Sequence, residues 1–235
     1  MRLDKYLKEN NFVFSRTKAQ ELIQDNNVLV NDIVVNKNNY EVKSDDIVDI
    51  KENIEFVSRS GDKLKQALIE FNISVKDFVC LDIGASTGGF TDCLIQNDAK
   101  QVYAVDVGNN QIHSTLKENK KVLIFEDIDV RDFLQKNDII FDFICVDVSF
   151  ISLKHILPCI QNRFKKDLVL LYKPEFEVGQ ENLKQGIVKS EKTVDIFLKD
   201  FENFVNSLNL KIKKIIKTNL KGKHGNQEYL IHIQK

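Results

Sequence analysis

The spacing of apolar residues changes along this chain and predicts two kinds of structure. In the first fifty residues, apolar positions recur at helical spacing in two short stretches, the second of which follows Ser15, a suitable capping residue. The apolar faces of these helices are Leu3, Tyr6 and Leu7, and Ala19, Leu22 and Ile23. The run from Val28 to Val35 has an Asn-Asp pair at its centre and predicts a β-hairpin, and residues 47–50 predict a further strand.

From Val57 onward, apolar runs alternate with helical stretches. The helical stretches include residues 90–96 and 152–163. The runs predicted to be buried strands are 79–84, 102–107, 122–125, 141–148 and 168–172. This βαβ alternation predicts a parallel sheet with helices on both faces.

After Lys173 the pattern changes again. A polar loop leads to a long helix, from about Glu191 to Leu208, and then to strands at 211–218 and 229–233. Because no helix separates these last two strands, we expect them to pair antiparallel at the edge of the sheet. The prediction is therefore an α/β protein with a Rossmann-like, mostly parallel sheet and an antiparallel terminal hairpin, plus a small α+β module. The expected domains are residues 1–55 and 56–235.

Composition limits the functional classes. The chain has 235 residues, is 43% hydrophobic and carries a formal net charge of −1, so nucleic-acid binding would have to rest on local patches. No segment approaches the roughly 18 consecutive apolar residues of a membrane helix, and the first residues lack the apolar core of a signal peptide. The four cysteines lack C-x-x-C spacing; they are Cys80, Cys93, Cys145 and Cys159. We therefore expect a cytoplasmic protein with reduced cysteines and no metal site.

The segment LDIGASTGGFTD, residues 81–92, predicts a small-molecule pocket. An apolar strand breaks into a glycine-rich turn and then a helix, which leaves backbone N–H groups free to bind a ligand. The residues expected to bind it are Gly84, Ala85, Ser86, Gly88, Gly89 and Phe90. Ser86 replaces the second glycine of a dinucleotide fingerprint, where the backbone must approach a pyrophosphate, so NAD and FAD are disfavoured. S-adenosylmethionine has no phosphate and tolerates the serine.

Three acidic residues follow successive strands. Asp106 is placed to bind both ribose hydroxyls of an adenosine, and Asp127 or Asp129 could contact the adenine amino group. Helix capping is the alternative for each aspartate. Three acids at successive strand ends favour the binding role.

Two lysines and two carboxylates form a candidate catalytic set. Asp147 and Lys173 follow the fourth and fifth strands, so both should project over the edge of the sheet where ligands bind in open α/β folds. Lys63 precedes the first strand, and Glu228 precedes the last. Such a set could align a ribose hydroxyl and remove its proton during methyl transfer. The carboxylates would raise the pKa of Lys173, whereas Lys63 and burial would lower it, so Lys173 is either a base or an orienting group. A purely structural Lys–Asp salt bridge is the alternative.

The N-terminal segment resembles a known RNA-binding module. RLDKYL followed by SRTKAQELIQDNNVLVND is similar to the αL module of a small-subunit ribosomal protein. This resemblance implies RNA contacts by Arg2, Arg16 and Lys18. Charge alone would not, because residues 1–55 contain eight basic and eleven acidic side chains.

The remaining motifs resemble one enzyme family. Lys63, Asp147, Lys173 and Glu228 are similar in order and spacing to the K-D-K-E set of FtsJ-like ribose 2'-O-methyltransferases, which have the class I methyltransferase fold. The motifs SRSGDKLKQAL, LDIGASTGGFTD, VDVSFISL, YKPEFEVG and GNQEYL resemble the TlyA family, once called haemolysin A. The resemblance implies S-adenosylmethionine-dependent 2'-O-methylation of cytidine in ribosomal RNA, of the large subunit and for some members also the small one. Residues 128–131 depart from the expected T-N-x-R, and residues 221–224 lack an expected proline.

Two further features bear on RNA. Residues 211–223 contain six lysines and no acids, which indicates either RNA contact or a solvated edge strand. Arg59, close to Lys63, is a stronger candidate for phosphate binding.

Three other functions compete with methyl transfer. One is a non-catalytic RNA-binding ribosome-assembly factor that retains the fold, and the intact catalytic set argues against it. The others are a membrane-lytic protein, disfavoured by the lack of a strongly amphipathic cationic helix, and a dinucleotide oxidoreductase, disfavoured by Ser86.

Overall fold

The computed structural model describes residues 1–13, 15–24, 26–50, 55–222 and 225–235. The chain divides into two compact units, Met1–Ser58 and Arg59–Lys235. The sequence prediction places the boundary after residue 55, beside the undescribed residues 51–54, and it stays a prediction. Lys223 and His224, parts of the lysine-rich segment and of the loop that lacks a proline, also lie outside the described residues.

The first unit contains two helices and a three-stranded sheet, as the apolar pattern predicts. Its elements are α1 (Leu3–Glu9), α2 (Arg16–Gln24), β1 (Val28–Val30), β2 (Ile33–Val34) and β3 (Val48–Ile50). The strands are antiparallel in the order β2-β1-β3. Ser15 Oγ accepts the N–H of Lys18, the capping bond expected at this helix start. Asn31 and Asp32 both have positive φ, which suits a tight hairpin turn.

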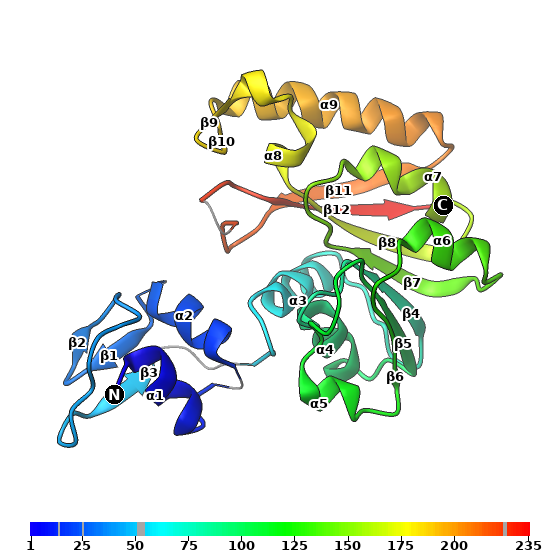
Figure 1. Ribbon diagram of the computed structural model, residues 1–235. Helices are drawn as coiled ribbons and strands as arrows, with labels where there is room; N and C mark the ends of the chain where they lie inside the picture. Colours follow the sequence, from blue (N-terminus) through cyan, green and yellow to red (C-terminus); the bar gives the residue numbers. More distant parts are fainter. Residues whose placement is uncertain (14, 25, 51–54, 223–224) are drawn as a thin grey trace. The chain divides into compact units, whose positions relative to one another are not determined.

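The second unit is built around a seven-stranded sheet in the order β11-β12-β8-β7-β4-β5-β6 (Figure 1). The strands are β4 (Val79–Ile83), β5 (Gln101–Val105), β6 (Val122–Phe125), β7 (Phe141–Val146), β8 (Phe164–Tyr172), β11 (Lys211–Lys217) and β12 (Tyr229–Gln234). Strands β4 to β8 are parallel, whereas β12 is antiparallel to both β8 and β11. The predicted mostly parallel sheet with an antiparallel terminal hairpin is confirmed.

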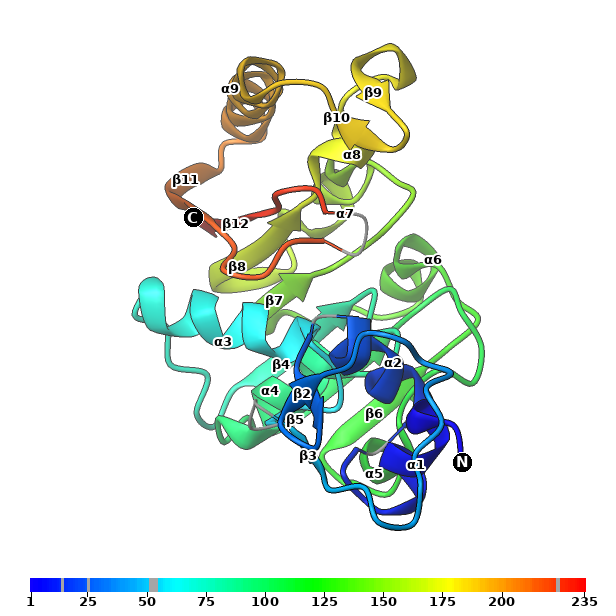
Figure 2. The same ribbon diagram turned by 90° about the vertical axis from the view of Figure 1, so that its left-hand side faces the viewer.

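Helices cover both faces of this sheet (Figures 1 and 2). The helices are α3 (Ser60–Glu70), α4 (Gly89–Gln96), α5 (Ser114–Lys117), α6 (Val130–Gln135), α7 (Leu157–Ile160), α8 (Pro174–Glu177) and α9 (Glu191–Ser207). Helices α3 and α4 pack together on one face, and apolar residues of α6, α7 and α9 form one large core with the other. Central strands such as β8 carry apolar side chains towards both layers, so their sequences are almost continuously hydrophobic.

The segment between β7 and β8 differs from the prediction of one helix over 152–163. It consists of a 3₁₀ turn (Leu153–His155) followed by α7, and β8 begins at Phe164, earlier than the predicted Leu168. The early start is hidden in the sequence because Lys165 and Lys166 are exposed and interrupt the apolar run. The polar loop after Lys173 also contains structure: α8, a 3₁₀ turn (Gln180–Asn182) and a small hairpin, β9 (Leu183–Lys184) and β10 (Ile187–Val188).

The described residues contain neither a membrane-spanning helix nor a metal-binding cluster. None of the described helices is both long and apolar enough to cross a membrane. In the same part of the chain, no cluster of three or more His, Cys, Asp or Glu side chains could hold a metal ion.

Candidate active site

A cavity of about 460 Å³ opens at the carboxyl ends of β4, β5 and β7. Gly84 and Ser86 line it from the turn after β4, Asp106 from the end of β5, and Asp147 from the end of β7. A Cβ atom on Gly84 would lie 2.5 Å from the carbonyl oxygen of Asp147, and Gly84 has a φ of +81°. Only glycine therefore lets the turn approach β7 this closely.

Asp106 organises the turn on its other side. Its Oδ2 accepts the N–H of Ser86 at 2.7 Å, and its Oδ1 accepts the N–H of Gly108 at 2.6 Å. The hydroxyl of Ser86 is 3.1 Å from Oε1 of Gln111, another residue of the cavity wall. The predicted acid at the end of the second parallel strand thus lies in the cavity, next to the glycine-rich turn.

The two other predicted aspartates differ from one another. Asp127 is exposed, and the cavity lining does not include it. Asp129 lines the cavity but also caps α6, accepting the N–H of Arg131 at 2.8 Å. Its hydrogen bonds with the Arg131 guanidinium lower the pKa of Asp129, so this carboxyl is an anion at neutral pH. Of the two, Asp129 is the one placed to meet a ligand.

The other turn residues support the cavity from behind. Gly88 has a φ of +97°, and a Cβ there would lie 2.3 Å from a side-chain carbon of Leu116. Gly89 begins α4, and Ala85 and Phe90 are buried. Beneath them, the carboxylate of Asp82 on β4 accepts the hydroxyl of Thr91 at 2.6 Å. These residues shape the turn through packing.

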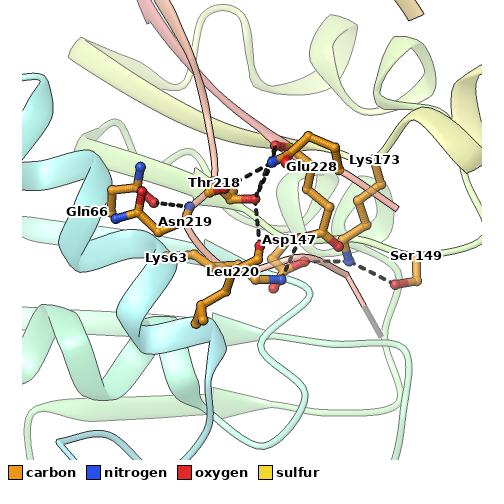
Figure 3. A network of polar contacts seen from close by, with 10 residues as sticks. Lys63, Gln66, Asp147, Ser149, Lys173, Thr218, Asn219, Leu220 and Glu228 are labelled. Carbon is orange, nitrogen blue, oxygen red and sulfur yellow. Dashed lines mark hydrogen bonds and ion pairs between the residues drawn. The ribbon is translucent and has the colours of Figure 1, made fainter. Parts of the chain in front are cut away.

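The four residues of the predicted catalytic set come together as two ion pairs (Figure 3). Lys173 Nζ is 2.6 Å from Asp147 Oδ1, and Lys63 Nζ is 2.5 Å from Glu228 Oε2. All four side chains are largely buried, the most exposed having 15% of its surface free. Asp147 and Lys173 follow parallel strands, whereas Glu228 precedes the antiparallel β12. The reversed direction of β12 brings the start of that strand to the same edge of the sheet.

Charges around Lys173 decide its protonation state. Burial alone would lower its pKa, but the carboxylates of Asp147, Glu228 and Glu175 outweigh burial, and the pKa of Lys173 is raised. Burial raises the pKa of Glu228, against the opposing effect of Lys63. Lys173 therefore carries a full positive charge at neutral pH. Of the two roles that the sequence left open, the orienting one fits this charge.

Residues that the sequence patterns do not single out also surround the Lys173–Asp147 pair. Ser149 Oγ accepts a hydrogen bond from Lys173 Nζ at 3.0 Å (Figure 3). Phe150 follows it, has a φ of +64° and lies 91% exposed at the cavity wall. The signal was present in the motif VDVSFISL, because residues directly after a strand at this edge of the sheet face the ligand cavity.

The basic residues predicted to bind RNA have varied surroundings. Arg2 and Arg16 are about half exposed and both bind the fully buried Asp4, at 3.1 and 2.9 Å. Burial would raise the pKa of Asp4, but hydrogen bonds from Arg2, Gln20 and Arg16 lower it well below its usual range. Lys18 is buried, with 5% of its surface free.

In the second unit, Arg59 immediately precedes α3. Within the lysine-rich segment, Lys214 pairs with Glu70 and Lys217 with Glu191. These two lysines thus have acidic partners, as expected of a solvated edge strand.

Comparisons with known proteins agree on the organisation of the chain. Residues 56–235 match the FtsJ-like methyltransferase family, and residues 1–48 match the S4 domain. Hemolysin A of Brachyspira hyodysenteriae is 39% identical over 237 residues, covering 99% of both chains. The 23S rRNA (cytidine-2'-O)-methyltransferase TlyA of Campylobacter jejuni is also 39% identical, covering 94% of both.

Solved structures support the same conclusion. A Streptococcus thermophilus protein that carries a hemolysin name has a TM-score of 0.78 at 35% identity, over all of this chain and 88% of that one. A magnesium protoporphyrin IX methyltransferase from Synechocystis, solved with bound SAH, has a TM-score of 0.53 at 13% identity over 75% of this chain and 82% of its own, which shows a shared fold. By its two matched domains and its full-length relatives, this chain belongs to the TlyA (hemolysin A) family of FtsJ-like methyltransferases with an N-terminal S4 domain.

Proposed function

We propose that this protein transfers a methyl group from S-adenosylmethionine to the ribose 2'-hydroxyl of a cytidine in ribosomal RNA, in the cytoplasm. The observation that carries the proposal is the pair of buried lysine–carboxylate contacts beside the cavity at the carboxyl edge of the sheet. The curated relatives named for this activity act on 23S, or on 16S and 23S, rRNA, and we propose the large subunit as the principal substrate. We also propose residues 1–55 as the RNA-binding domain and 56–235 as the catalytic domain.

The cavity fits a nucleoside cofactor. Gly84 keeps the turn open towards Asp147, Ser86 occupies a position where a pyrophosphate would need glycine, and Asp106 is an acid at the end of β5. Asp106 would hold the ribose hydroxyls and Asp129 the adenine amino group. S-adenosylmethionine, when bound, supplies a methyl group on a positively charged sulfur, which a nucleophilic oxygen can attack.

The two lysine–carboxylate pairs have different tasks in this proposal. Lys173 begins the reaction as an ammonium, so it donates to the 2'-oxygen and holds it, but has no lone pair to accept the hydroxyl proton. The proton therefore ends on the carboxylate of Asp147, whose Oδ1 is 2.6 Å from the ammonium: as the O–C bond forms, Lys173 passes one of its own protons to Asp147 and takes the hydroxyl proton in its place, and so remains an ammonium. The Lys63–Glu228 pair fixes the other side of the site, and the charge of Glu228 helps keep Lys173 protonated.

A methyl-transfer assay tests the activity. Labelled S-adenosylmethionine is incubated with large subunits, small subunits and stripped rRNA, using wild type, Lys173→Met and Lys165→Met. Lys165 is the matched control because it too pairs with an aspartate, Asp142 of β7, and it lies at the opposite end of β8. We expect label on rRNA with wild type and Lys165→Met, and a loss of at least about 100-fold with Lys173→Met.

The position of the label is equally decisive. Nuclease-resistant dinucleotides would place the methyl group on the 2'-oxygen. RNA binding without label on any substrate would instead support a non-catalytic assembly factor.

A binding assay tests the cofactor assignment separately. S-adenosylmethionine should raise the melting temperature of wild type, whereas NAD should not. Gly84→Ala should weaken this binding by roughly tenfold or more, because the new methyl group would collide with the Asp147 carbonyl. Gly186→Ala is the control, since Gly186 has a similar φ of +79° and open space around its Cβ position. Equal binding by the two variants would contradict the assignment.

A further inference from the structure

Gln66 links the helix that carries Lys63 to the segment that follows β11. It lies three residues after Lys63 on α3, so the two side chains share one side of the helix. Its Nε2 donates to the carbonyl oxygen of Lys217 at 3.0 Å, and its Oε1 accepts the N–H of Asn219 at 2.9 Å. Figure 3 shows Gln66 beside Asn219, close to the two ion pairs. One side-chain amide therefore satisfies a backbone acceptor and a backbone donor on either side of Thr218.

Thr218 connects this segment to Glu228. The N–H of Thr218 donates to the backbone oxygen of Glu228 at 2.9 Å, and the buried Thr218 hydroxyl lies 3.1 Å from the same oxygen. The carboxylate of Glu228 in turn contacts Lys63 at 2.5 Å. The contacts form a closed ring, which runs from Lys63 along α3 to Gln66, through residues 217–219 to Glu228, and back to Lys63.

Gly222 confines the Glu228 carboxylate from another side. A Cβ atom at Gly222 would lie 2.6 Å from Oε1 of Glu228, so the loop backbone packs directly against the carboxylate. The N–H of Gly222 donates to the backbone oxygen of Asn226, which ties these two residues together. The Glu228 side chain is only 4% exposed and packs against Gly222, so we expect its position to depend on the backbone around it.

We propose that Gln66 is a positioning residue for the Lys63–Glu228 pair. It anchors residues 217–219 to α3 and so sets the distance between the ammonium and the carboxylate, without touching the reacting atoms. Glutamine suits this position because its amide offers a donor and an acceptor together, which neither glutamate nor an aliphatic side chain does at neutral pH. This inference rests on the methyl transfer proposed above, in which that pair shapes the site.

Steady-state kinetics of Gln66→Ala test the proposal. We expect kcat to fall roughly ten- to hundredfold, because small misplacements of catalytic groups are costly, while KM for S-adenosylmethionine stays within about twofold. The matched control is Gln161→Ala, which removes another glutamine amide that donates to a backbone carbonyl, that of Pro158. It should keep wild-type kinetics. Combining Gln66→Ala with Glu228→Gln should add little further loss, because the two changes act through the same pair.

The isosteric change Gln66→Glu separates positioning from general stability. At neutral pH the introduced carboxylate can still accept the Asn219 N–H but repels the Lys217 carbonyl oxygen. When protonated, it can donate again. The ratio of variant to wild-type kcat should therefore rise as pH falls from about 8 to about 5. A pH-independent ratio, or wild-type kcat in Gln66→Ala, would overturn the proposal.

A carboxyl titration distinguishes failure of this proposal from failure of the proposed function. The Glu228 carboxyl, ¹³C-labelled and identified by its absence in Glu228→Gln, can be titrated by NMR without any RNA. Gln66→Ala should move its midpoint by about half a unit or more from the wild-type value. An unchanged midpoint overturns the positioning role, whether or not methyl transfer occurs. Wild type that methylates no substrate, with a shifted midpoint in the variant, would refute the function and leave the positioning contact supported.

Discussion

Strands β7 and β8 carry a lysine–aspartate pair at each end, and the two pairs differ in their surroundings. Near the start of the strands, Lys165 Nζ lies 2.5 Å from Asp142; beyond their ends, Lys173 Nζ lies 2.6 Å from Asp147. Lys165 has 61% of its side chain exposed, whereas Lys173 has 11%. The two aspartates are similarly buried, with 22% and 15% of their side chains exposed, so nearly the same contact distance occurs with a solvated lysine at one end and a largely buried lysine at the other. The distance between two charges says little about their role until their solvation is known.

The exposed and the buried ion pair differ in what they contribute to stability. An exposed pair contributes roughly 0–1 kcal/mol to stability because water and salt screen it. A buried pair must recover the cost of removing both charges from water, so it is a poor choice for stability alone. At the carboxyl edge of an open sheet, where ligands bind, such a pair is better explained by chemistry.

Removing one carboxylate from each end would test the comparison most strongly. In Asp147→Asn, Lys173 loses the partner with which it would share the ribose proton, and methyl transfer should fall by about 10²- to 10⁴-fold. In Asp142→Asn, the rate should stay within about twofold. The measurement is kcat at saturating S-adenosylmethionine. Similar losses in both variants would mean that the buried pair acts only by holding the fold.

A third carboxylate, in the middle of the sheet, should show the effect of burial on stability. Burial raises the pKa of Asp82 to about 7, and the charge of Asp147 adds to the rise. The folded protein then binds a proton that the unfolded chain has lost between pH 4 and 7, so stability from this group falls as pH rises. The difference in free energy of unfolding between Asp82→Asn and wild type should therefore shift in favour of the variant by up to about 4 kcal/mol as pH rises from 4 to 8.

Urea unfolding of both proteins at several pH values gives this difference. If the difference in free energy of unfolding between Asp82→Asn and wild type does not depend on pH, Asp82 stays ionised in the folded protein.

The smallest effect is expected at the exposed pair. Lys165→Met should change the free energy of unfolding by less than about 1 kcal/mol, and the change should shrink in about 1 M salt. Asp142 also accepts the N–H of Val79, so part of its role survives the loss of Lys165. Urea unfolding at low and high salt measures the change. If the free energy of unfolding fell by about 3 kcal/mol, the Lys165–Asp142 pair would behave as a buried ion pair does.

The sequence predicted the elements around the site better than the contacts within it. Asp147 and Lys173 could be placed at one edge because each directly follows an apolar run, and parallel strands end at the same edge. Which lysine contacts which carboxylate could not be predicted. Both carboxylates were expected to act on Lys173; the structure shows Glu228 in contact with Lys63, with its charge still acting on Lys173. That outcome depends on β12 lying between β8 and β11, which local patterns do not encode.

Local patterns also hid residues whose roles arise only from tertiary contacts. Lys165 and Lys166 concealed the first part of β8 because polar side chains at the start of a strand resemble a loop. Gln66 looked like one more polar position on an amphipathic helix, and its two backbone partners lie more than 150 residues further along the chain. The glycine-rich turn of the cofactor cavity could be predicted, because a strand, glycines and a helix follow one another directly in the sequence.

The place of β12 in the sheet also sets the order in which the site can be completed. This strand is the latest of the seven in the sequence, yet it lies between β8 and β11, both made before it. During synthesis, β11 cannot join the sheet until β12 is available, and Lys63 waits for a partner 165 residues away. Contacts of such long range form slowly. The parallel strands, with Lys173 and Asp147, can therefore form before the protein is able to close its active site.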